Sequence, residues 1–264
     1  MRALRNSLII VGAVFIIAVL AIVGTKLFSD PSRSVNEAQS ESATSPAVRE
    51  QVSPAQKGSW TATSYGVSVY IPSAADGEVL TNKLASSEMQ ECDPMAVPRV
   101  PIETRVEEID SRYFLFTTTD GPSKIEKGLP VGYSHTPAGA ATAMYNASVA
   151  LIPVDTDGKT FVRSDAARER LADPELDPLP MDEVGGYSKE GAAFPFYFRV
   201  LSCNQDAITL EIANAYGATT EPIAAVRMQM VWRDNDWRVN VAAPIETRDV
   251  TGDEVGSWAR WKIG

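Results

Sequence analysis

The expected fold is decided by residues 194–244, which read FPFYFRVLSCNQDAITLEIANAYGATTEPIAAVRMQMVWRDNDWRVNVAAP. Apolar and polar side chains alternate through most of this stretch, which is typical of strands that bury one face. Clusters of Asn, Asp, Gly and Pro interrupt the alternation and predict short turns. Short turns join antiparallel neighbours, so the stretch predicts a four-stranded meander. The expected strands cover residues 194–203, 207–216, 223–232 and 237–244.

The residues before this meander predict helices. Thr136 suits the position that caps a helix, and Pro137 suits the first helical position, where a missing N–H costs nothing. Alanine-rich residues follow as far as Pro153, and a second helix is expected over residues 164–172. Helices followed by an antiparallel meander predict the α+β class, with the helices packed on one face of a curved sheet.

The residues between 59 and 130 show weaker patterns. Alternation over 65–71 and an aromatic, β-branched run over 111–122 each predict a strand. Residues 82–110 are expected to be irregular, with a short helix in their first part. We therefore expect 59–130 to be a lead-in of strands and loops to a helix-helix-four-strand core over 131–264.

Residues 7–28 predict a transmembrane helix that anchors the chain. The run from Leu8 to Thr25 holds 18 uncharged, mostly apolar residues, close to the roughly 20 that cross a bilayer. A cleaved signal peptide is the alternative, but its apolar core is usually shorter and ends at a small-residue cleavage site. Arg2 and Arg5 precede the run, which favours a cytoplasmic N-terminus over residues 1–6.

Residues 29–58 predict a disordered linker, because they contain no aromatic residue and very few large aliphatic ones. Residues 59–264 then form an extracytoplasmic α+β domain of a single-pass membrane protein. The first 26 residues hold three basic and no acidic side chains, so the rest carries 21 basic against 34 acidic ones. Such an acidic body excludes nucleic acid as the main partner. The expected partners are the lipid bilayer, through residues 7–28, and other membrane or envelope proteins.

His135 is the only histidine in the chain. A catalytic base needs a nucleophile or acid beside it, and the sequence neighbours Ser134 and Thr136 do not reliably meet its side chain. We therefore expect His135 to hydrogen-bond at the start of the helix, with general-base catalysis as the alternative. Anion binding by the N–H groups of this helix start is a further alternative. The residues expected to have structural roles here are Gly132, Tyr133, His135, Thr136, Pro137 and Gly139.

Trp232 and Trp237 flank the polar turn of VWRDNDWRV. We expect them to pack across a hairpin, and a role in lining a ligand pocket is the alternative. No motif for an activated serine, a phosphate-binding loop or a dinucleotide site occurs, and two cysteines with one histidine cannot form an ordinary zinc site. We expect no catalytic residue, no metal site and no cofactor.

Cys92 and Cys203 are the only cysteines, and both lie in the part expected outside the membrane. Thiols in oxidising compartments usually pair, so the two predict a disulfide. The loop that this disulfide would close spans 111 residues.

Two resemblances follow from these patterns. The helices and the meander that ends in VWRDNDWRV resemble the nuclear-transport-factor-2-like cone fold. Asp120-Gly121-Pro122, the run GYSHTPAGA over residues 132–140 and a closing tryptophan, Trp258 or Trp261, resemble a family of actinobacterial membrane-anchored proteins associated with conjugative elements. The second resemblance implies no established enzymatic activity.

The resemblance implies a non-catalytic scaffold or assembly protein of an actinobacterial cell-envelope apparatus that serves conjugation or secretion. Similar arrangements of one anchor and one outer domain occur in scaffold subunits of secretion channels and of mycobacterial lipid-import systems. The alternative function is an extracytoplasmic domain that binds a small molecule or lipid in the cavity of the cone.

Overall fold

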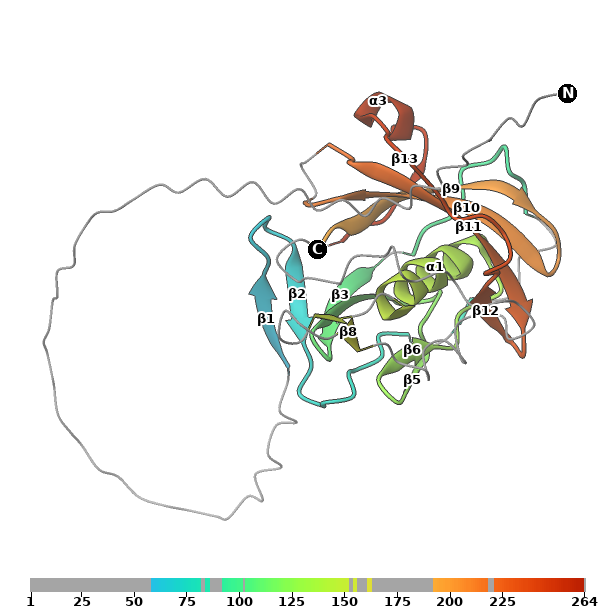
Figure 1. The fold of residues 1–264 in the computed structure, drawn as a ribbon. Helices are drawn as coiled ribbons and strands as arrows, with labels where there is room; N and C mark the ends of the chain where they lie inside the picture. The colour runs from blue at the N-terminus through green and yellow to red at the C-terminus, as the bar shows by residue number, and fades with distance from the viewer. Residues whose placement is uncertain are drawn as a thin grey trace, which may run out of the picture. The chain divides into compact units, whose positions relative to one another are not determined.

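Figure 1 shows the fold in a computed structural model of the chain. All described residues belong to the larger of the two compact units into which the chain divides. The predicted helices over 7–28 and 164–172 lie outside the described residues, as does the linker up to residue 57. No helix in the described part is long and apolar enough to cross a membrane. The structure describes residues 58–81, 84–85, 92–101, 103–151, 154–155, 161–162, 192–217 and 221–263.

The predicted meander is confirmed and forms most of one sheet. Its four strands pair antiparallel in the order of the chain, and two further short strands join them. The turn between the last two strands places Asp234 and Asn235 at φ 51° and 58°, as tight hairpin turns require. The strands are β9 (Phe194–Cys203), β10 (Ala207–Ala215), β11 (Ala224–Arg233) and β12 (Asp236–Val239), with β13 (Glu246–Arg248) beside β11 and β14 (Ala259–Arg260) beside β9.

The residues before the helix form a second sheet in the order β1-β2-β3-β4. The pair β2–β3 is parallel and the other two pairs are antiparallel. Every residue of β4 is buried, so this strand belongs to the core. The strands are β1 (Ser59–Ala62), β2 (Ser68–Ile71), β3 (Thr104–Ile109) and β4 (Arg112–Thr117).

Two small hairpins complete the described strands. One joins β5 (Lys124–Glu126) to β6 (Leu129–Val131), and it lies between the β1–β4 sheet and the helix along the chain. The other joins β7 (Val154–Asp155) to β8 (Phe161–Val162), directly after the helix.

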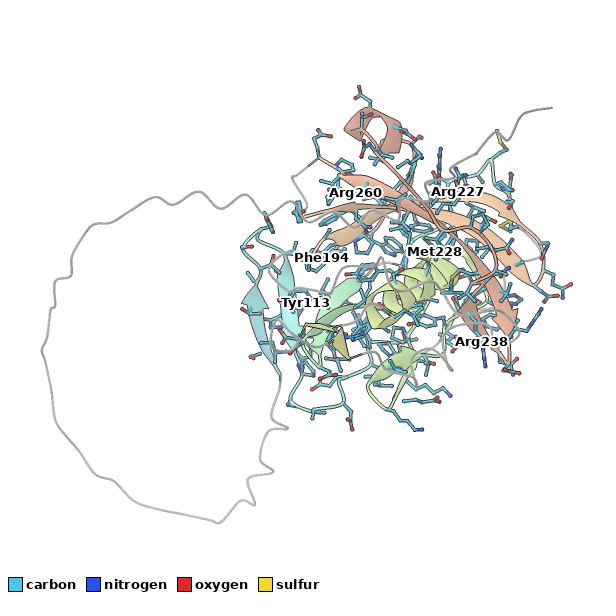
Figure 2. All side chains as sticks on the ribbon, in the orientation of Figure 1. Tyr113, Phe194, Arg227, Met228, Arg238 and Arg260 are labelled. Atoms are coloured by element: carbon cyan, nitrogen blue, oxygen red, sulfur yellow. A yellow bond between two sulfur atoms is a disulfide. The ribbon has the colours of Figure 1, made fainter. Side chains whose placement is uncertain are left out.

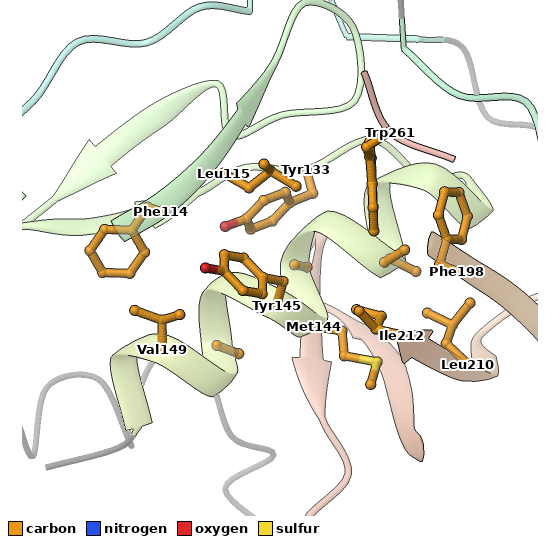
Figure 3. Packing of buried hydrophobic residues seen from close by; sticks show 14 of the residues in the cluster. Phe114, Leu115, Tyr133, Met144, Tyr145, Val149, Phe198, Leu210, Ile212 and Trp261 are labelled. Carbon is orange, nitrogen blue, oxygen red and sulfur yellow. The ribbon is translucent and has the colours of Figure 1, made fainter. Parts of the chain in front are cut away.

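Helix α1 (Pro137–Leu151) is buried almost all round, with thirteen of its fifteen residues inside. It contacts β4 on one side and β9, β10, β11 and β12 on the other (Figure 1). Its many alanines permit this close approach, because small side chains let the neighbouring strands lie near the helix backbone. Figure 3 shows Phe114 and Leu115 of β4 on one side of the helix and Phe198, Leu210 and Ile212 on the other.

Polar groups of α1 are bonded inside this core. The side chain of Asn146 accepts from the N–H of Leu115 at 2.7 Å and donates to the carbonyl of the same residue at 2.8 Å. It thereby satisfies the free backbone edge of β4, which would otherwise be costly to bury. At the other end, Arg112 donates to the carbonyls of Val149 and Ala150, which a helix leaves without partners in its last turn.

The two sheets also meet directly. Tyr113 of β4 stacks on Phe194 of β9 with ring centroids 5.7 Å apart (Figure 2). The disulfide between Cys92 and Cys203 is a second link, because it ties the loop before β3 to the end of β9.

The predicted fold class is wrong. The described residues are mostly strand, with α1 and the four-residue helix α3 (Gly252–Val255) as the helices among them, and α1 is not laid on one face of a single curved sheet. Residues 59–130, expected as a lead-in, supply a sheet of their own on the far side of α1. The end of 82–110, expected to be irregular, forms β3. The physical reason is the composition of α1, since a helix that is apolar on every side needs cover on every side.

Candidate functional site

A buried aspartate organises the start of α1. Asp120 is fully buried, and its Oδ1 accepts from the hydroxyls of Ser134 at 2.8 Å and Thr136 at 2.7 Å. Thr119 donates to its Oδ2 at 2.8 Å. The Thr136 hydroxyl also accepts from the N–H of Gly139 at 3.0 Å, so the predicted helix cap is confirmed. The stretches 120–122 and 132–140, separate in sequence, therefore meet at one carboxylate.

Gly139 is needed because the backbone turns tightly here. A Cβ on this residue would lie 2.2 Å from the carbonyl oxygen of Ser134, well inside contact distance. Gly132 has φ 79°, a left-handed conformation that favours glycine. Both glycines that were expected to be structural thus have a geometric reason.

The β11–β12 hairpin holds the loop before α1 from the other side. Asp236 is buried and accepts from the N–H groups of Gly132 at 2.8 Å and Tyr133 at 3.0 Å. The indole of Trp237 donates to the carbonyl of Ser134 at 2.9 Å. Backbone and indole contacts therefore fix the path of the loop independently of Asp120.

His135 lies on the tryptophans of the same hairpin. Its ring stacks on Trp232 with centroids 4.2 Å apart, and Trp237 is 5.3 Å away. Its Nε2 is 2.8 Å from the carbonyl oxygen of Gln205, and because a carbonyl only accepts, Nε2 carries the hydrogen. The hydroxyls of its neighbours point to Asp120 instead. The arrangement is that of a positioned side chain, and its structural role stays a prediction.

Trp232 and Trp237 are paired across the hairpin, as expected. Their ring centroids are 5.2 Å apart in an edge-to-face arrangement, which is a favourable aromatic geometry. The cleft described below is lined by other residues.

The predicted disulfide is confirmed, with the Cα atoms of Cys92 and Cys203 6.4 Å apart. It fixes one end of a loop formed by residues 92–99, here called the pinned loop. Arg99 fixes the other end, since its Nη2 lies 3.2 Å from Oδ1 of Asp120. Between the two ends the chain makes a tight turn, in which Asp93 accepts from the N–H of Met95 at 2.8 Å.

The tip of the pinned loop is apolar and faces solvent. Met95 is 92% exposed and Val97 is 64% exposed. A cleft of about 160 Å³ separates this loop from the first turn of α1. Its walls are the disulfide at Cys92, the loop as far as Arg99, the residues Thr136 to Ala138 and Val200 of β9.

The cleft is not suited to the anion binding considered for the helix start. The N–H of Gly139 already donates to Thr136, and Pro137 has no N–H to offer. Asp93 adds a carboxylate to the wall, and the guanidinium of Arg99 in the same wall is paired with Asp120. Within the described residues, no group of three or more His, Cys, Asp or Glu side chains could hold a metal ion.

The sequence did not predict that Asp120 is the central acceptor of this site, or that Asp236 and Arg99 fix the loops around it. Asp120 was noted as part of a motif, but its partners come from residues 14 and 16 positions later. Asp236 and Arg99 gave no signal, because isolated charged residues beside turns are usually exposed. One feature of the sequence could have indicated the exposed tip, namely the mostly apolar DPMAVP segment that directly follows Cys92.

Comparison with known proteins gives one match. A family described as a domain of unknown function, DUF8175, matches residues 70–261, which include the Asp120 network, the pinned loop and the tryptophan hairpin. No curated protein and no solved structure matches the chain.

Proposed function

We propose that this protein, which belongs to the DUF8175 family, is a non-catalytic docking domain of the cell envelope that binds another envelope protein through the pinned loop. One observation carries the proposal. Two large apolar side chains, Met95 and Val97, face solvent on a loop that is fixed at both ends.

The exposure of Met95 has no explanation in the stability of the fold. A residue that is 92% exposed buries almost no apolar area and so contributes little to folding. Methionine is common on protein-binding surfaces because its flexible, polarisable side chain adapts to a partner. A loop fixed before binding also loses less conformational entropy when it binds, which raises affinity.

The interior favours docking over the alternative, small-molecule or lipid binding. Ligand sites usually offer about 300–1,000 Å³ of enclosed space. Here α1 fills the space between the sheets, and the cleft beside the pinned loop measures about 160 Å³. Such a cleft suits a single side chain of a partner, seated between the pinned loop and α1.

The non-catalytic part of the proposal is supported by how the polar groups are used. The hydroxyls of Ser134 and Thr136 lie beside Asp120, and Nε2 of His135 is held by a backbone carbonyl. Asp120 and both hydroxyls are almost fully buried, and the Thr136 hydroxyl caps α1, so these contacts serve the fold instead of presenting an activated nucleophile to a substrate.

The proposal puts the domain outside the cytoplasmic membrane, with residues 7–28 as the anchor and the N-terminus in the cytoplasm. The disulfide supports this location because disulfides persist in oxidising compartments. The resemblance of residues 120–122 and 132–140 to conjugation-associated membrane proteins adds that the apparatus serves conjugation or secretion.

Photo-crosslinking in the native host tests the proposal. A photoreactive amino acid replaces Met95 in the full chain, and a second strain carries it at Lys127, an exposed turn residue between β5 and β6. We expect discrete protein adducts from position 95 and none from position 127. Equal adducts from both positions, or none from position 95, would contradict a docking role for the pinned loop.

A further inference from the structure

The six-stranded sheet of β9 to β14 has one face that points away from α1, and this face carries an unusual group of arginines. Arg199 of β9, Arg227 of β11 and Arg248 of β13 all donate to the same carboxylate, Glu211 of β10. Their Nη2 atoms lie 2.6, 2.7 and 3.0 Å from its oxygens. Glu211 is buried beneath them, so three guanidinium groups share one internal anion.

The strand register explains why these side chains meet. Glu211 is directly opposite both Arg199 and Arg227, and residues opposite each other share a face of the sheet. Arg248 joins them from β13, where it is opposite Ala225, two residues before Arg227 in β11. Arg260 of β14 is opposite Tyr197 on the same face.

Aromatic rings hold two of the guanidinium groups flat on this face. The guanidinium of Arg199 lies 4.4 Å above the ring of Trp258, and that of Arg260 lies 5.4 Å from the ring of Tyr197. Such cation–π contacts help to position the planar groups on the sheet. Arg227 and Arg260 are labelled on this sheet in Figure 2. The four arginines with Trp258 and Tyr197 are called the arginine face below.

One buried carboxylate does not balance three arginines. The remaining charge is met by Glu246, whose carboxylate lies 2.6 Å from Nη1 of Arg227, and by Glu254, 3.0 Å from Nη1 of Arg248. Both are solvent-accessible: the side chain of Glu246 is 53% exposed and that of Glu254 is 36% exposed. They come from a three-residue strand and a four-residue helix at the C-terminal end.

We propose that the arginine face binds an acidic segment of a partner protein, whose carboxylates take the places of Glu246 and Glu254. The occupant is inferred from charge and geometry. The side chains of Arg199, Arg227 and Arg248 are each 35% exposed in a chain with a net charge of −10. Planar guanidinium groups match carboxylates with two parallel hydrogen bonds, and Glu254, one of this chain's own exposed carboxylates, already binds Arg248 in that geometry.

The exchange changes the stability of the fold little. Exposed ion pairs contribute little to stability, so the fold tolerates the release of Glu246 and Glu254 from their arginines. Tryptophan, tyrosine and arginine are also the residues that dominate binding energy at protein interfaces. The inference concerns a surface separate from the pinned loop, so it stands or falls independently of the proposed function.

Binding of a fluorescein-labelled decaglutamate peptide to the full chain in a zwitterionic detergent tests the inference by fluorescence anisotropy. We expect saturable binding at about 20 mM salt that weakens at least tenfold by about 200 mM, because exposed charges are screened. Arg260→Gln should weaken binding about three- to tenfold.

A gain-of-binding variant makes the test sharper. Glu246→Gln removes an internal competitor without disturbing the Glu211 cluster, and we expect it to tighten peptide binding about two- to fivefold, as loss of an exposed ion pair allows. Glu126→Gln is the matched control, because Glu126 also forms an exposed ion pair, with Lys124 on the β5–β6 hairpin. The inference is overturned if decaglutamate does not bind or if both variants bind it alike.

Discussion

Glu107 on β3 and Glu211 on β10 are both almost fully buried, yet they differ in what surrounds them. Burial raises the pKa of Glu107 to about 7, although the N–H of Glu78 and the guanidinium of Arg105 favour its ionised form. Burial also raises the pKa of Glu211, but hydrogen bonds from three arginines outweigh it and bring the pKa down to about 2. The number of arginine partners, more than burial, therefore decides the charge of a buried glutamate in this protein.

The same difference separates a closed surface from an open one. Residues 72–81 lie over Glu107, whose Oε1 accepts from the N–H of Glu78 at 2.6 Å. Arg105 donates to the carbonyl of Glu78 at 2.8 Å and stacks 4.2 Å from the ring of Tyr70. On the other sheet nothing equivalent covers the arginines in the described part of the chain, and they stay partly exposed beside the solvent-accessible Glu246 and Glu254. Glu107 therefore holds residues 72–81 against the first sheet, whereas Glu211 holds three partly exposed arginines on the second.

The largest effect is expected from Glu211→Ala. Removing the shared acceptor leaves the three clustered guanidinium groups with only the partly exposed Glu246 and Glu254 as counter-charges. The free energy of unfolding should fall by about 3–5 kcal/mol, the usual cost of breaking a buried ion pair from one side. Urea unfolding at pH 7 measures it, with Glu246→Ala as the exposed control, which should cost about 1 kcal/mol or less. Equal losses in the two variants would contradict the central position of Glu211.

A smaller effect is expected from Arg105→Met. The variant keeps part of the packing on Tyr70 but removes the donor to Glu107 and to the carbonyl of Glu78. The free energy of unfolding should fall by about 2–3 kcal/mol at pH 8, as for a lost charged hydrogen bond. The loss should be smaller at pH 5, because Glu107 can then become neutral in place. A loss that does not change with pH would mean that Glu107 is not the group affected.

The next effect, from Glu107→Gln, depends on pH. The pKa of Glu107 is raised in the folded state, so folding favours the protonated carboxyl. Its contribution to stability is fully present below the unfolded pKa of 4.5 and is lost as pH rises through about 7. Glutamine imitates the neutral acid, so variant and wild type should be similar near pH 5. At pH 8 the variant should be more stable by about 1–3 kcal/mol. Thermal unfolding between pH 5 and 8 checks this. A variant that is less stable than the wild type at pH 8 would contradict the raised pKa of Glu107.

The smallest effect is expected from Arg199→Lys. Lysine keeps the charge but cannot make both hydrogen bonds that Nε and Nη2 of Arg199 donate to Oε2 of Glu211, and it loses the contact with the ring of Trp258. Because two arginines remain, the free energy of unfolding should fall by only about 1 kcal/mol. A loss as large as that of Glu211→Ala would show that one arginine, rather than the set of three, stabilises the buried carboxylate.

The sequence predicted those parts of the fold that depend on local patterns. The strands over 194–244 followed from alternation, and the start of α1 followed from Thr136 and Pro137. The disulfide followed from cysteine count and compartment. These features need no knowledge of which distant segments meet.

The first sheet could not be predicted in the same way. β3 has the sequence TRVEEI, and its two adjacent glutamates look like a solvated turn. Glu107 is buried only because residues 72–81 and Arg105 supply its partners. The Asp120 network and the arginine face have the same origin. Their members are ordinary charged residues until strand register and loop packing bring them together.

The claim that arginine partners set the charge of the buried glutamates is tested most directly by a carboxyl NMR titration. The folded protein is labelled with ¹³C at glutamate side-chain carboxyls, and Glu107 and Glu211 are followed in one sample from pH 8 to about pH 3. We predict a midpoint for Glu107 near 7, while Glu211 stays ionised throughout, in line with a pKa of about 2. Midpoints near 4.5 for both groups, or protonation of Glu211 before Glu107, would contradict the account.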